Sequence, residues 1–402
     1  MPSSRPALPR AIWAIGFVSM FMDISSEMIH ALLPVYLTTV LGASMMSVGL
    51  IEGIAEATAS ITKLFSGAVS DWFGKRKLLA VIGYGLAAFT KPVFPLAGSI
   101  GWITAARFID RIGKGIRGAP RDALVADIAP KALRGAAFGL RQSLDTVGAF
   151  LGPVIAIALM WWSANDFKFV FWIAVIPAFV AVAVLVLGVK EPADVPRAKG
   201  QVWPLSGQAM KAMGASFWLI MAIATLFTLA RFSEAFLILK AQQSGLSLML
   251  IPMVLVVMNV TYALASYPAG VLSDRFGRAA LLGVGMMVLI GADIVLARAT
   301  TLAGVAGGII LWGLHMGLTQ GTLSTLVADH APKALRGTAF GFYNLVTGLA
   351  LLAASLLAGY LWDIQGAALT FYAGAGFAAF ALALLALTNA FILAPDEDMP
   401  GG

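Results

Sequence analysis

Three ionisable residues near the start of the chain share one spacing. Asp23, Glu27 and His30 stand at i, i+4 and i+7, which places them on one face of a helix. They lie inside an apolar run, and a charge at the centre of a bilayer costs at least ~2.5–3.5 kcal/mol, so each needs a partner or water. A carboxylate in such a position can take up and release a proton. The same face could instead bind a cation or the amine of a substrate.

Basic residues repeat this spacing in another apolar run. Arg107, Arg111 and Lys114 also share a face, and we expect Arg111 to lie at a depth comparable to that of Asp23. The candidates for proton coupling or substrate binding are Asp23, Glu27, His30, Glu56, Arg111, Lys114, Asp145, Arg231, Glu234 and His315. The alternative interpretation is that these residues form structural ion pairs, in which acidic helices neutralise a basic one.

The composition indicates that membrane spans hold these residues. Of the 402 residues, 60% are hydrophobic and only 12% are charged, and the mean hydropathy is +0.89. A soluble domain carries roughly 25% charged residues. The same numbers exclude a disordered, collagen-like or coiled-coil chain. The absence of cysteine excludes a disulfide scaffold, a thiolate metal site and cysteine catalysis.

The apolar runs are long enough for helices that cross a bilayer, which need about 20 residues. We predict an all-α membrane protein with twelve transmembrane helices. The predicted spans are 11–37, 46–70, 77–97, 101–122, 134–161, 166–189, 213–240, 248–272, 278–297, 302–328, 337–362 and 367–392.

The basic residues predict the orientation of the spans. If the N-terminus is cytoplasmic, 18 of the 27 Lys and Arg residues fall on the cytoplasmic side and four on the other, with five inside spans. The positive-inside rule therefore predicts a multi-pass protein of the cell (inner) membrane with both termini in the cytoplasm. Because these charges are spread over many loops and form no single patch, nucleic acid is not a predicted partner.

The chain contains an internal repeat. The segment 126–139 matches 328–341 at an offset of 202 residues, and 66–75 resembles 269–278 at an offset of 203. Two matches at nearly one offset predict two parallel bundles of six helices each. We place them at residues 1–189 and 213–402, with a cytoplasmic linker at 190–212.

Two six-helix repeats joined by a cytoplasmic linker resemble the major facilitator superfamily. The family motif between spans 2 and 3 reads Gly-x3-Asp-Arg-x-Gly-x-Arg-Arg, and Gly67, Asp71, Gly74 and Arg76 match it, while Trp72 stands at the first Arg. The resemblance covers the whole chain. It implies alternating access, in which two half-bundles rock about a site near the midplane of the membrane.

Two further motifs resemble those of this superfamily. Arg111-x-x-Lys114-Gly115 is similar to the Arg-x-x-Gln-Gly of span 4, with Lys in place of Gln. Gly148-x3-Gly152-Pro153 is similar to a motif of antiporters, which favours export.

The resemblance also implies a cytoplasmic gate around the loops that follow spans 2 and 4 of each half. In the family, the Asp of the loop motif engages basic residues and a neighbouring helix end when the cytoplasmic side is closed. The predicted gate residues are Gly67, Asp71, Gly74, Arg76, Arg117, Arg121, Asp127, Arg134, Asp274, Arg275, Asp329 and Arg336. The alternative is that the basic residues of this set only determine the membrane topology, but the positive-inside rule does not explain why the aspartates recur at repeated positions.

These observations predict a secondary active transporter of a small organic solute, coupled to protons, with the lipid bilayer, the solute and protons as partners. Alternatives are a proton-coupled importer or a transporter of copper or a divalent cation, which Met249, Met253 or the Asp23–His30 face could bind. No P-loop and no His-Glu-x-x-His motif is present, so we expect neither an enzyme nor a cofactor. We expect a monomer.

Overall fold

The apolar runs fold into helices, because a segment without water must satisfy its backbone groups internally. The computed structural model describes residues 8–73, 75–130, 133–190, 213–331 and 336–393, and within these ranges the chain forms helices and no strand. The side chains of 67–73, 134–135, 267, 274, 336–338 and 389–393 are not described. Ten stretches of the described chain are long and apolar enough to cross a membrane. Two further helices of similar length, α3 (Met45–Phe73) and α6 (Ile100–Ile128), are richer in charge. The predicted all-α fold with twelve spans is confirmed.

The chain divides into two compact units. The first comprises Met1–Tyr36 and Thr58–Gln201, and the second comprises Leu37–Ala57 and Val202–Gly402. Helix α3 therefore contributes its first half to the second unit and its second half to the first. Apart from Lys190, the predicted linker 190–212 lies outside the described residues.

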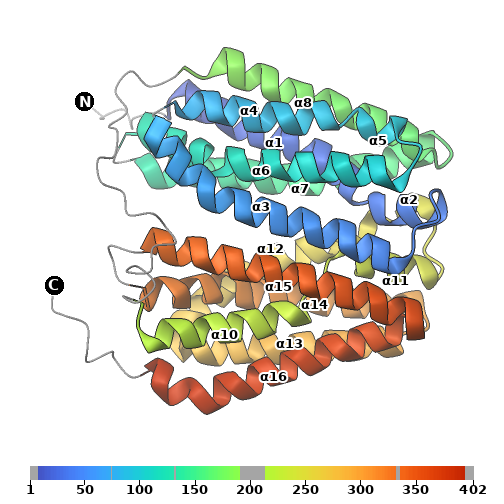
Figure 1. The fold of residues 1–402 in the computed structure, drawn as a ribbon, viewed down its shortest axis with the longest axis vertical. Coiled ribbons are helices and arrows are strands. Elements are labelled where there is room, and N and C mark those ends of the chain that lie inside the picture. Colours follow the sequence, from blue (N-terminus) through green and yellow to red (C-terminus); the bar gives the residue numbers. More distant parts are fainter. Residues whose placement is uncertain (1–7, 74, 131–132, 191–212, 332–335, 394–402) are drawn as a thin grey trace, which may run out of the picture. The chain divides into compact units, whose positions relative to one another are not determined.

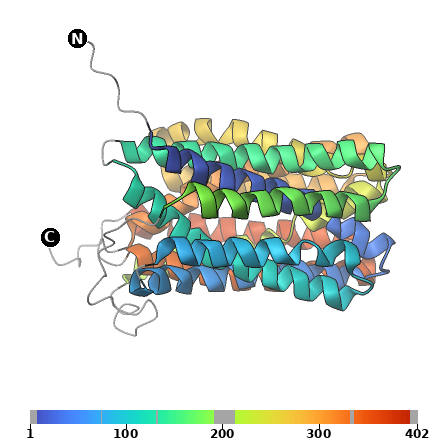
Figure 2. The same cartoon turned by 90° about the horizontal axis from the view of Figure 1, so that it is seen from above.

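Five long helices build most of the first unit, and they run side by side in Figures 1 and 2. Helix α1 packs against α7 and α8, and α4 packs against α6. A core of buried apolar and aromatic side chains, among them Ile12, Ile15 and Tyr84, joins them. Beside α6, these helices are α1 (Arg10–His30), α4 (Arg76–Thr90), α7 (Arg134–Trp162) and α8 (Phe167–Gly188).

The second unit repeats this arrangement. Helix α10 packs against α15 and α16, as α1 does against α7 and α8, and α13 packs against α14, as α4 does against α6. Its helices are α10 (Ala215–Ala230), α11 (Ala235–Gln243), α12 (Met253–Phe276), α13 (Arg278–Arg298), α14 (Leu302–Asp329), α15 (Arg336–Gln365) and α16 (Ala367–Leu393).

Four of the predicted spans are interrupted. The eighth begins with a short 3-10 helix (Leu248–Leu250) and a turn before α12. The first breaks between α1 and α2 (Leu33–Thr39), and the third breaks at Lys91, before α5 (Val93–Leu96). The seventh breaks at residues 231–234, between α10 and α11. There, side-chain hydroxyls replace helical bonds: the Ser233 amide donates to Ser355 Oγ at 3.2 Å and the Ala235 amide donates to Ser233 Oγ at 3.3 Å. Broken helices at membrane depth are stable when protein groups satisfy the freed backbone in this way.

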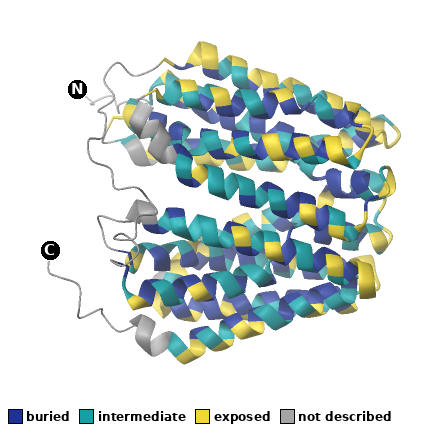
Figure 3. Cartoon of the chain, viewed as in Figure 1, coloured by how far each residue is buried: buried dark blue, intermediate teal, exposed yellow. Residues whose placement is uncertain are grey.

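Large apolar side chains remain exposed along the helices. Trp161, Trp162, Leu187 and Leu387 are 73%, 74%, 84% and 80% exposed, and exposed positions recur along the helices in Figure 3. Apolar exposure on this scale is expected of helix faces that contact lipid.

The first half of α3 packs closely on α15 within the second unit. A Cβ added to Gly49 would lie 2.1 Å from the Ser355 carbonyl oxygen, and one on Gly359 would lie 2.4 Å from the Met45 carbonyl oxygen. Asp363, near the end of α15, accepts hydrogen bonds from the Met45 and Met46 amides at 3.0 and 2.9 Å. The carboxylate thus caps the N-terminus of α3, where amides have no helical partner.

Candidate functional site

The two carboxylates of α1 lie on a glycine face of α7. A Cβ added to Gly148 would lie 2.5 Å from the Met20 carbonyl oxygen and 3.1 Å from Asp23 Cβ, and one added to Gly152 would lie 2.7 Å from Glu27 Cβ. Only glycine permits this approach of the two backbones. The motif that resembles an antiporter motif is therefore the surface on which Asp23 and Glu27 are held.

Asp23 meets an arginine of α6. Arg117 Nη2 lies 4.0 Å from Asp23 Oδ1, and the guanidinium carbon lies 4.6 Å from the centre of the Tyr84 ring. The Arg117 side chain is 6% exposed and the Asp23 side chain 27%, so the pair is accessible mainly from the carboxylate. Contact with an aromatic face and a carboxylate fixes the guanidinium plane, which a lysine could not reproduce.

A second arginine of α6 joins α1 and α7. Arg121 Nη1 donates to Ser19 Oγ at 3.1 Å and lies 3.6 Å from Asp145 Oδ1. Arg141 lies 3.3 Å from Asp145 and 3.7 Å from Asp122, which also receives a bond from Arg121 Nε at 3.1 Å. We call these residues, together with Asp23, Arg117 and Tyr84, the arginine network. It spans α1, α4, α6 and α7.

The arginine beside Asp23 is not the one that we expected from the sequence. We expected Arg111 beside Asp23, and the structure places Arg117 there. Arg111 is buried on the same helix and Lys114 is exposed. Glu27 pairs with His30 on its own helix, at 3.4 Å between Oε2 and Nδ1.

The length of α6 accounts for this difference. The predicted span ended at residue 122, so Arg117 and Arg121 stood next to a gating loop, but α6 continues through Pro120 to Ile128. Both side chains therefore lie on the bundle interior. Sequence reasoning also missed Ser19 and Tyr84, which carry no charge and gave no signal. The helical face that carries Arg107, Arg111 and Lys114 also includes Arg121, fourteen residues after Arg107, so the same spacing could have identified Arg121.

Each unit holds a matching ion pair where one helix begins and another ends. Arg76 Nη1 lies 2.5 Å from Asp127 Oδ2, and Arg278 pairs with Asp329, so both residues are shifted by 202 positions. Arg278 was not among the predicted gate residues. Arg275 is exposed. Gly74 lies outside the described residues, Gly67 belongs to α3, and the side chains of Asp71, Arg134, Asp274 and Arg336 are not described.

Two of the predicted residues of the second unit, Arg231 and His315, lie near aromatic rings. The Arg231 guanidinium lies 5.6 Å from the centre of the Phe227 ring. The buried His315 ring lies 6.3 Å from Phe227 and 5.2 Å from Trp312. Glu234 is half-buried beside the break between α10 and α11, and Glu56 belongs to the part of α3 that groups with this unit.

The two units differ at the positions of the network. Residues 202 positions after Arg117, Arg121 and Asp145 are Thr319, Leu323 and Thr347. Both threonine hydroxyls donate to carbonyls of their own helices. Across the described residues, no group of three or more His, Asp or Glu side chains is placed to hold a metal ion.

A sequence profile of the Major Facilitator Superfamily matches residues 15–355. The chain belongs to the major facilitator superfamily. Within this superfamily it is 33% identical over 366 residues to an uncharacterized MFS-type transporter of Methanocaldococcus jannaschii, covering 89% of this chain and 90% of that protein. The predicted membership is confirmed, and the protein is a multi-pass membrane transporter.

Solved structures of this superfamily share the fold. A POT family transporter in complex with a thioalcohol-conjugated peptide has a TM-score of 0.81 at 13% identity, covering 96% of this chain and 97% of that one. The nucleoside transporter NupG has a TM-score of 0.74 at 14% identity, covering 96% of this chain and 100% of that one. The TM-scores show a common architecture. At this level of sequence identity, the substrates of those proteins are not assigned to this chain.

Proposed function

We propose that the protein is a proton-coupled secondary transporter that exports a small organic solute by alternating access. The observation that carries this proposal is the arginine network, in which Asp23 on α1 faces Arg117 on α6, on a glycine surface of α7. The network supplies carboxylates that can bind a proton and guanidinium groups that respond to it.

The coupling step follows from this geometry. A proton on Asp23 removes the negative charge that faces Arg117, so the attraction between α1 and α6 weakens. Loss of the proton restores it. Because Arg121 on α6 contacts both Ser19 on α1 and Asp145 on α7, a change at Asp23 is transmitted to α7. Coupling of this kind belongs to the first unit, since the second has Thr319 and Leu323 where the first has arginines.

The remaining parts of the proposal rest on charge and motif. The excess of basic residues supports an inner-membrane protein with both termini in the cytoplasm, and the protein acts as a monomer. Gly148-x3-Gly152-Pro153 supports antiport of the solute against protons. In the same orientation, the ion pairs Arg76–Asp127 and Arg278–Asp329 belong to the cytoplasmic gate.

The test begins with the solute. A thermal-shift screen of small organic compounds on purified protein identifies a ligand, because binding to the native state raises the apparent stability. Flux of that ligand in proteoliposomes is then measured with and without a pH gradient, together with counterflow exchange. Asp23→Asn and Glu27→Gln should abolish gradient-driven accumulation and keep counterflow, since exchange need not release the proton.

The matched control is Asp166→Asn. Asp166 caps α8 through the Lys168 and Phe169 amides, and asparagine caps a helix about as well as aspartate. This variant removes one carboxylate of the same unit outside the network, and should behave as wild type. Full gradient-driven accumulation by both acid variants would overturn the coupling role of Asp23 and Glu27.

A further inference from the structure

One buried carboxylate of the second unit lacks a counter-charge. Asp293 on α13 is 0% exposed, and neither of its carboxylate oxygens has a hydrogen-bond partner among the described residues. Within the same part of the chain, no basic side chain forms an ion pair with it. Burial of an ionised group without a partner is strongly unfavourable, so this carboxyl group either holds a proton or pairs with a bound cation.

The repeat shows which charge is missing. Lys91 lies 202 residues before Asp293, and its Nζ donates to Asp110 Oδ1 at 2.9 Å and to Ser26 Oγ at 3.1 Å. Trp312 lies 202 residues after Asp110. The first unit therefore holds a cation and an anion at these two positions, while the second holds an anion and an aromatic ring. A bound cation would supply in the second unit what Lys91 supplies in the first.

The surroundings of Asp293 offer oxygen acceptors. A Cβ added to Gly374 would lie 2.7 Å from Asp293 Oδ2, 3.3 Å from the Ala230 carbonyl oxygen and 3.1 Å from Phe232 Cε1. The missing side chain thus leaves the carboxylate and the carbonyl facing one small space. Ala230 is the last residue of α10, where the chain is interrupted and the helix end carries partial negative charge.

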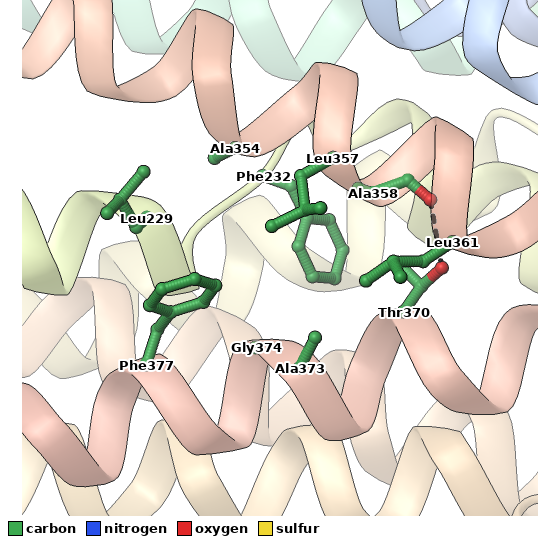
Figure 4. A pocket seen from close by; sticks show the side chains of 10 residues that line it. All are labelled: Leu229, Phe232, Ala354, Leu357, Ala358, Leu361, Thr370, Ala373, Gly374 and Phe377. Carbon is green, nitrogen blue, oxygen red and sulfur yellow. Dashed lines mark hydrogen bonds between the residues drawn. The ribbon is translucent and has the colours of Figure 1, made fainter.

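A small pocket adjoins this space. Phe232 and Gly374 line it together with Leu229, Ala354 and Phe377, and its empty volume is about 180 Å³, which includes space outside the protein surface (Figure 4). Its lining is mainly apolar, and the Thr370 hydroxyl in it donates to the Ala358 carbonyl. The pocket therefore brings open volume to the residues that cover Asp293, and adds no competing charge.

We propose that Asp293 and the Ala230 carbonyl at the break between α10 and α11 bind one sodium ion. A metal cation contacts both carboxylate oxygens and the carbonyl together, whereas a proton on the carboxyl would leave one oxygen without a partner. A single carboxylate balances one positive charge, which a monovalent cation supplies. Carbonyls at the ends of interrupted helices are the groups that coordinate sodium in other transporters.

The site is independent of the proposed function, because it lies in the unit without the arginine network and is tested by binding. The purified full-length protein is unfolded thermally in NaCl and in N-methyl-D-glucamine chloride at equal ionic strength, at several pH values. We expect a saturable rise of the wild-type Tm with sodium, because the ion binds only the native site. Asp293→Asn should lose this rise.

A glycine pair on α16 provides the matched control. Gly374→Ala places a methyl group between the acceptors and should raise the half-saturating sodium concentration by about 10-fold or more, as loss of a supporting group does at other metal sites. Gly376→Ala, where an added Cβ meets nothing within 4 Å, should match wild type. If Asp293→Asn does not fold, this pair and the binding of radiolabelled sodium to wild type decide the question.

Three results would overturn the proposal. The first is a wild-type Tm that does not respond to sodium, and the second is an unchanged response in Asp293→Asn. The third is an Asp293-dependent rise that follows pH alone, which would assign the site to a proton. None of these results bears on Asp23, since no transport is measured.

Discussion

The Arg76 guanidinium at the start of α4 lies 2.5 Å from the Asp127 carboxylate near the end of α6, and Arg278 and Asp329 form the same pair 202 residues later. Two copies of one ion pair, each at the same helix ends of its unit, are not needed for topology, which basic residues alone establish. The pairs tie the start of one helix to the end of another, at the loops that the sequence predicts to gate the cytoplasmic side.

Removal of both pairs should shift the conformational equilibrium. In Asp127→Asn combined with Asp329→Asn, we expect a changed distribution of distances between spin labels at two exposed positions, Lys75→Cys and Phe276→Cys, because the loops of each unit lose their anchor. The cost in stability should be about 0.2–1 kcal/mol for each pair, as for other accessible pairs. The chain has no native cysteine, so the labels are specific. An unchanged distance distribution would count against a gating role.

Arg117 should be required for coupling through its shape as well as its charge. Arg117→Ala should lower gradient-driven flux by about 10-fold or more, which corresponds to about 1.4 kcal/mol. Arg117→Lys keeps the charge, loses the planar contact with Tyr84 and should fall in between. Lys77→Ala removes a basic residue that donates to the Val186 carbonyl outside the network, and serves as control. Equal flux in Arg117→Ala and Lys77→Ala would show that the network is structural.

The glycine face of α7 should tolerate no side chain beside α1. Gly148→Ala brings a Cβ within 2.5 Å of the Met20 carbonyl, so we expect a lower Tm in detergent, with overpacking of about 1–3 kcal/mol. Gly139→Ala on the same helix meets nothing within 4 Å, and should be neutral or stabilise by up to about 1 kcal/mol. Equal Tm values for Gly148→Ala and Gly139→Ala would contradict the close contact between α1 and α7.

The cap of α3 should depend on the carboxylate of Asp363. Asp363→Ala leaves the Met45 and Met46 amides without their acceptors, and should cost about 0.5–2 kcal/mol. Hydrogen exchange at these two amides should accelerate, while exchange at Lys168 and Phe169, capped by Asp166, should not change. Asp363→Asn should lie closer to wild type. If exchange at Met45 is unaffected by Asp363→Ala, the cap makes no contribution in the membrane protein.

Helix periodicity predicted which residues share a face, but it could not predict which faces meet. The spacing of Asp23 and Glu27 predicts one face of α1, and α1 presents that face to the glycines of α7. The same reasoning could not choose between Arg111 and Arg117 as the partner of Asp23. That choice depends on the offset between α1 and α6 along their axes, which no local pattern records.

The amino-acid sequence predicts the twelve spans, the two repeats and the superfamily. The spans are predictable because a helix that crosses lipid needs a long apolar segment, and the repeats because matching residues recur at one offset. Only the packing of the helices shows that two positions that are equivalent in the repeat have different charged neighbours. Lys91 meets Asp110, whereas Asp293 meets no counter-charge among the described residues. A charge inside a bundle is stabilised by groups on the neighbouring helices. Those helices come from distant parts of the chain, and their side chains differ between the two copies.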